Sequence, residues 1–210
     1  DVYKRQIPRK GRKARIATKE QRYRQFAAGL GLEQTDAGAW VARVDDIALL
    51  GLNSCKPPRT PLSARGEVTR DQLRWLSDVA NQEEFRGARL RLGMVHHHLL
   101  RMPFALGKRN PIEVAMRLRN APRVMHTCTE AGLDILFNGH RHHGYMVQLP
   151  AHPMVVSSPS STLGCKFAHR DYVWLVDLDR HHPYPVLHAF DGLRATVPAG
   201  SKVFTRHLTS

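Results

Sequence analysis

Cysteine is scarce in this sequence of 210 residues. Cys55, Cys128 and Cys165 are odd in number and form no C-x-x-C pair. This argues against a disulfide framework and against a zinc site made of thiolates. The same usage indicates a reduced, cytoplasmic setting.

Long hydrophobic runs are also lacking. The longest candidates, such as Ile47 to Leu52, have the length of a strand, so we expect no membrane span. The sequence has no G-x-S-x-G turn either, which argues against a serine nucleophile of the α/β-hydrolase type.

Acidic residues are outnumbered, with 18 Asp and Glu against 32 Lys and Arg and a net charge of +14. The first 25 residues hold ten of the basic residues against two acidic ones, which leaves about +6 for the rest of the chain. Such a run is typical of a solvated segment, so nucleic-acid binding is an alternative that the charge distribution does not favour.

The opening "DVYKRQ" resembles the translation of a transposon adapter used to prepare DNA for sequencing. We therefore expect residues 1–6 to lie outside the native protein and residues 7–210 to form the domain.

Strand and helix patterns alternate at first and give way to strands alone, which predicts one α/β domain. Helices are expected at 19–30, after the capping pair Thr69 and Gln72, after Asn110, and at 123–131 before Gly132. Strands are expected on either side of an Asp45-Asp46 turn, at 89–95, at 133–137, and within "PMVVSSPSS", "DYVWLVDLD" and "PVLHAFDG".

Two histidine groups follow strands directly. "VHHH" ends the strand at 89–95, and "GHRHH" follows the strand at 133–137. If these strands are parallel neighbours, both groups emerge at the carboxyl-end edge, where open α/β sheets bind ligands. Neutral imidazole is a good ligand for divalent transition metals, so this edge is a candidate metal site.

These segments resemble a known family. "MVHHHLLRMP" and "ILFNGHRHHG" are similar to the last two motifs of the calcineurin-like metallophosphoesterases, H-[HY]-P and G-H-x-H. "IALLGLNSCKP", "RGEVTRDQLRWLSDVA" and "VVSSPSSTLG" resemble segments around those motifs. The resemblance covers roughly residues 20 to 190 and implies a metallophosphatase-like α/β/β/α sandwich.

By this resemblance, His96 and His140 bind one metal ion and His142 binds another. His98 stands where the family has proline, so His97 is an alternative to His96.

The family's earlier motifs, D-x-H, G-D-x-x-[DE] and G-N-H-[DE], do not precede these two. We expect them upstream of Ile7, so the chain would be an N-terminally truncated, partial metallophosphoesterase domain.

The implied parent is a metal-dependent phosphoesterase, a hydrolase with two divalent ions (Mn, Fe or Zn) and a phosphorylated substrate. The ions would act as Lewis acids and generate a hydroxide for in-line attack. Without the first motifs, we expect the fragment itself to be inactive. The alternatives are a basic nucleic-acid-binding module and an inactive protein of the same fold.

Overall fold

The computed structural model describes most of the region from Leu32 to Ser158. The described residues are 21–22, 24–25, 27–29, 32–55, 65–100, 116–141, 144–158, 173–177 and 186–190, with the backbone alone at 33, 173–177 and 186–190.

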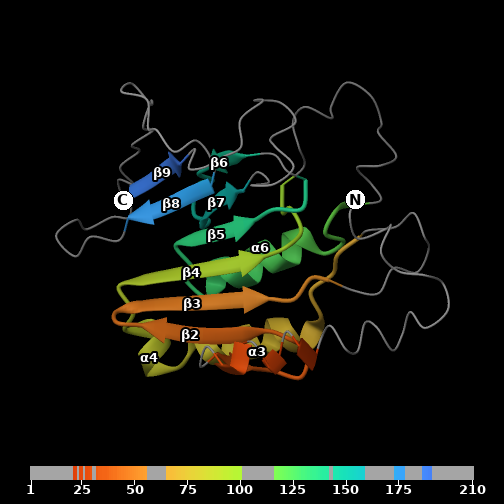
Figure 1. Cartoon of the computed structure of the whole chain (residues 1–210), viewed down its shortest axis with the longest axis vertical. Coiled ribbons are helices and arrows are strands. Elements are labelled where there is room, and N and C mark those ends of the chain that lie inside the picture. Colours follow the sequence, from red (N-terminus) through yellow and green to blue (C-terminus); the bar gives the residue numbers. More distant parts are fainter. Residues whose placement is uncertain are drawn as a thin grey trace.

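Seven strands form one mixed sheet in the order β1-β2-β3-β4-β5-β7-β6 (Figure 1). The central strands β3, β4, β5 and β7 are parallel, and antiparallel strands flank them on both sides. The bounds are β1 (Glu33–Gln34), β2 (Trp40–Val44), β3 (Ile47–Leu52), β4 (Leu90–Val95), β5 (Ile135–Asn138), β6 (Tyr145–Val147) and β7 (Met154–Ser157). The α/β architecture predicted from the sequence is therefore confirmed, and it is compatible with a metallophosphatase-like sandwich.

Helices cover one face of this sheet. They are α3 (Arg70–Ala80), the short α4 (Glu83–Arg86) and α6 (Ala121–Glu130). Leu76 of α3 and Val124 of α6 join Leu50 and Leu136 of the sheet in one core cluster, and all four are fully buried. Burial of such a side chain stabilises the fold by about 1.5–3 kcal/mol.

The opposite face of the sheet carries a second apolar cluster. Ile47, Leu92, Ile135, Met154 and Val156 belong to it, and each is buried. Because both faces are apolar, the central strands read as nearly continuous hydrophobic runs, as parallel strands buried on both faces do.

The C-terminal strand patterns also form strands. β8 (Val173–Asp177) and β9 (Val186–Phe190) pair antiparallel in a separate two-stranded sheet. Within the described part of the chain, no helix has both the length and the apolar character that a membrane span needs.

The predicted boundaries hold with small shifts. The Asp45-Asp46 turn joins β2 to β3, with Asp45 in the left-handed region at φ 53°. α6 begins at Ala121 rather than at 123, because Pro122 fits the first helical turn, where no N–H is needed. β5 begins at 135 rather than 133, because Leu133 still hydrogen-bonds back to the end of α6 through the Cys128 carbonyl, at 3.1 Å.

The predicted cap of α3 forms only in part. The Thr69 hydroxyl accepts a hydrogen bond from the Gln72 backbone N–H at 3.3 Å, as a capping box requires. The Gln72 side-chain amide donates to the Thr69 hydroxyl at 3.3 Å rather than accepting from the Thr69 backbone N–H. It also binds the main chain of Asn53, at the end of β3.

Some elements were not predicted, and some predictions lie outside the described residues. β1, α4 and β6 are too short to show a periodic pattern. The helix expected after Asn110, Cys165 and His142 all fall on residues that the structure does not describe.

Candidate functional site

The two histidine groups meet at one edge of the sheet. β4 and β5 are parallel neighbours, with Met94 paired to Phe137, and their arrowheads point the same way in Figure 1. The pairing continues beyond the strands, because the Gly139 N–H donates to the His96 carbonyl at 3.1 Å. The two loops that carry the histidines are therefore joined through their backbones.

His96 and His140 are in direct contact. Nε2 of His96 and Nδ1 of His140 lie 2.9 Å apart, and the ring centroids are 4.8 Å apart. Two ring nitrogens at this distance share one hydrogen, so one imidazole donates and the other accepts. Nε2 of His140 is buried and, among the described residues, has no hydrogen-bond partner.

His97 lies at the same edge and is only 4 % exposed. Its Nδ1 lies 2.8 Å from the hydroxyl oxygen of Ser54, which follows β3. Its ring centroid lies 4.4 Å from that of His140. His98 is buried as well, and its ring is nearly parallel to that of His140 at 6.5 Å. Three imidazoles of the first loop thus lie around the His140 ring of the second.

Electrostatics keep the central imidazole neutral. Burial, which has the largest effect, and the neighbouring His97, His96, His98 and Arg141 together lower the pKa of His140 to about 2. A neutral imidazole has a lone pair available for a metal ion, whereas imidazolium has none.

The backbone of His140 is in the left-handed region, at φ 73°. That conformation is uncommon for a residue other than glycine and costs on the order of 1–3 kcal/mol. This backbone conformation turns the chain sharply after β5, and the His140 ring lies against His96.

The imidazole nitrogens of His96 and His140 could supply part of the coordination shell of a single transition-metal ion. Two imidazole nitrogens on one tetrahedral ion lie about 3.3 Å apart, given bonds of about 2.0–2.1 Å. The His96–His140 separation of 2.9 Å is within a few tenths of an ångström of that value. The described residues contain no group of three or more His, Cys, Asp or Glu arranged to hold a metal, and His142 lies outside them.

A buried polar pair next to the histidines has no counterpart in the sequence-based predictions. Asn138, the last residue of β5, is paired with Ser157 of β7, and both side chains are buried. Within the described region, neither atom of the Asn138 side-chain amide has a hydrogen-bond partner. The predicted strand ended at residue 137, so the sequence pattern indicated neither the burial of Asn138 nor its unpaired amide.

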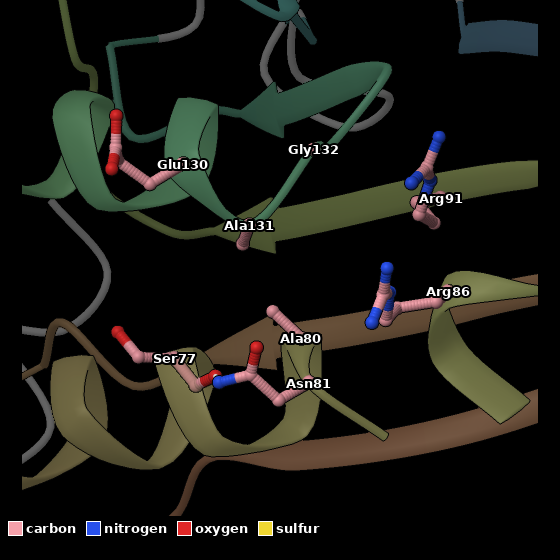
Figure 2. Close-up of a pocket in the computed structure, with 8 residues that line it drawn as sticks. All are labelled: Ser77, Ala80, Asn81, Arg86, Arg91, Glu130, Ala131 and Gly132. Atoms are coloured by element: carbon pink, nitrogen blue, oxygen red, sulfur yellow. The ribbon is translucent and has the colours of Figure 1, made fainter. Parts of the chain in front are cut away.

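A cavity of about 510 Å³ lies at the opposite end of β4 and contains none of these histidines. It opens between the C-terminal ends of α3 and α6, with Arg86 and Arg91 on one side and Ser77 and Glu130 on the other (Figure 2). Arg91 is 3.5 Å from the Asp134 carboxylate, which gives it a structural partner.

Comparisons with known proteins give likenesses to solved structures. No family model matches the chain, and no curated protein matches it. Among solved structures, the chain is similar to purple acid phosphatase PPD1 from yellow lupin (Lupinus luteus) seeds, with a TM-score of 0.48 and 11 % sequence identity. The match covers 81 % of this chain and 32 % of the phosphatase chain.

Proposed function

We propose that this chain is part of a metal-dependent phosphoesterase, a hydrolase of phosphoester bonds. The observation that carries the proposal is the approach of His96 Nε2 to His140 Nδ1, at 2.9 Å, at the carboxyl-end edge of two parallel strands. Open α/β sheets bind ligands at this edge. The proposed ligands are His96, His140 and His142, with His97 as the alternative to His96.

Each described residue has a defined task in this proposal. His140 stays neutral because of its surroundings, so its nitrogen remains a ligand over the whole physiological pH range. The Gly139–His96 backbone bond keeps the two loops in register. A bound divalent ion would polarise a phosphate oxygen and lower the pKa of a bound water.

The ligand set also limits what the chain does alone. A dinuclear centre of this class needs a carboxylate between its ions, and the described part of the chain holds no group of three or more His, Cys, Asp or Glu that could hold a metal. We therefore propose that the chain binds one ion, and that the second ion of the pair needs ligands from the motifs absent here.

Zinc titration tests this proposal. Calorimetry on the whole chain should give binding near one equivalent, and His140→Asn should weaken it at least tenfold. Asparagine tolerates the left-handed backbone of this position, so the fold should persist. His126→Gln, on the exposed side of α6, is the matched control and should bind as the parent does.

Two results would contradict the proposal. One is the absence of zinc binding to the parent chain. The other is equal zinc affinity in His140→Asn and His126→Gln, which would place the ion elsewhere.

X-ray absorption of the zinc-loaded chain should show nitrogen and oxygen ligands only.

A further inference from the structure

Ser54 contacts His97 in two ways. Its hydroxyl oxygen accepts a hydrogen bond from the His97 backbone N–H at 3.3 Å and lies 2.8 Å from Nδ1 of the ring. Ser54 is fully buried and His97 nearly so. The two residues are 43 positions apart in the chain, so only the folded sheet brings them together.

Packing leaves the His97 ring little room to turn. A Cβ built on Gly66 would lie 2.3 Å from Nδ1 of His97, so the ring lies directly against a glycine backbone. Gly66 is itself held by backbone hydrogen bonds to Arg117 and Arg119, at 3.2 and 2.9 Å. The ring is therefore enclosed between the end of β3 and this segment.

The residue before Ser54 is also fixed. The Gln72 side chain accepts a hydrogen bond from the Asn53 backbone N–H at 2.7 Å and donates one to the Asn53 carbonyl at 2.9 Å. Gln72 is 1 % exposed and lies on α3, which packs on the sheet. The position of the Ser54 hydroxyl is thus set by a helix and a strand together.

We propose that Ser54 is a positioning residue that orients His97 for metal binding, an inference that rests on the proposed function. With Nδ1 engaged by Ser54, Nε2 is the ring nitrogen that His97 offers to an ion. In this proposal the Ser54 oxygen accepts a hydrogen from the ring as well as from the His97 backbone N–H, so that Nδ1 carries the hydrogen and Nε2 the lone pair. Metal-binding histidines commonly donate their second N–H to such a partner.

The inference makes His97, the alternative to His96, the ligand that the first loop supplies beside His140.

Nitrogen-15 NMR of histidine-labelled protein tests the orientation directly. The His97 signals are assigned by their loss in His97→Gln. In the zinc-bound parent chain, we expect the Nδ1 shift of a protonated nitrogen and the Nε2 shift of a metal-bound nitrogen. Ser54→Ala should shift the His97 Nδ1 signal with or without zinc, and it should weaken zinc binding 10- to 100-fold.

Two further variants separate positioning from folding. Ser54→Thr keeps the hydroxyl and should restore zinc affinity to within about threefold of the parent. Ser54→Cys nearly keeps the side-chain volume of serine, but its thiol is a weak acceptor. It should therefore show the changes in His97 signals and zinc affinity that are expected of Ser54→Ala. It provides this test if the alanine variant does not fold.

The outcomes are distinguishable from those of the proposed function. Unchanged His97 signals in Ser54→Ala and Ser54→Cys would overturn the positioning role, whether or not zinc binds. Zinc binding by the parent with no change at His97 Nε2 would overturn its role as a ligand and leave the proposed function standing. Failure of the parent to bind zinc would overturn the proposed function, and the metal-free spectra would still decide whether Ser54 orients the ring.

Discussion

Both ends of the Gln72 side-chain amide bind the main chain of Asn53. One contact is 2.7 Å and the other 2.9 Å, and the glutamine is almost completely buried. A partly buried backbone N–H and C=O are thereby satisfied by a single side chain just after the end of β3.

Replacement of Gln72 by alanine should destabilise the chain strongly. Both backbone groups of Asn53 would lose their partner, and each loss costs about 1–3 kcal/mol. We expect the free energy of unfolding to fall by about 2–4 kcal/mol, measured by urea denaturation. Arg74→Ala is the control, since its ion pair with Asp71 is exposed and should change stability by less than about 0.5 kcal/mol. Similar losses in the two variants would show that the contact contributes little.

Gly66→Ala should displace the His97 ring. The added methyl group would overlap Nδ1, and such overpacking typically costs about 1–3 kcal/mol. We expect lower stability together with at least tenfold weaker zinc binding. At Gly29 a Cβ meets nothing within 4 Å, so Gly29→Ala should leave both measurements unchanged or slightly improved. Undiminished zinc affinity in Gly66→Ala would contradict the tight enclosure of His97.

Stability should depend on pH through His140. Its folded-state pKa is lowered to about 2, whereas an unfolded histidine has a pKa of about 6.5. Between these values the unfolded chain binds more protons. The contribution of His140 to the free energy of unfolding is therefore complete above about pH 6.5, and it is lost as the pH falls toward 2.

The size of this effect is bounded by one proton, about 1.4 kcal/mol per pH unit, and should be smaller because solvent screens the partly exposed ring. Urea unfolding of the parent and of His140→Asn from pH 7.5 to 4.5 measures it by difference. The variant should lose less stability than the parent over this range. Parallel pH curves would show that His140 titrates normally.

Cys128 should be chemically inert in the folded chain. It is fully buried, and burial raises the pKa of its thiol to about 12, so almost no thiolate exists at pH 8. Peptide mapping after iodoacetamide treatment should find the exposed Cys55 modified first and Cys128 modified only in denaturant. Equal rates for the two under native conditions would mean that α6 opens readily.

The chain alone should not turn over a phosphodiester. Bis(p-nitrophenyl) phosphate with Mn²⁺ or Zn²⁺ should be hydrolysed no faster than in metal-containing buffer, because among the described residues no group of three or more His, Cys, Asp or Glu could hold a metal, let alone two. Turnover that disappears in His140→Ala would sink this expectation and assign activity to the chain itself.

Local sequence patterns predicted the helices and strands whose apolar residues recur with a clear period. β3 and β4 appeared as strand-sized apolar runs, and α3 was marked by its cap and by Leu76 and its neighbours at helical spacing. The pairing of β4 with β5 explains why two histidine groups after strands were informative, since parallel neighbours bring their ends together.

What remained hidden depends on contacts between distant positions. Ser54 meets His97 across 43 residues, and Gln72 meets Asn53 across 19. No local period records such contacts, and serine and glutamine are common on surfaces. The unpaired amide of Asn138 is hidden for the same reason, because only the paired sheet decides which polar groups lack partners.

The parallel order of β3, β4 and β5 has a kinetic consequence. Each pairing closes a loop of about 40 residues, and Ser54, His97 and His140 come together only when all three strands are in place. In an unfolded chain these groups are no closer than any other distant residues. Metal added during refolding should therefore leave the folding rate unchanged and slow only unfolding, because the ion meets its ligands after the rate-limiting assembly of the sheet.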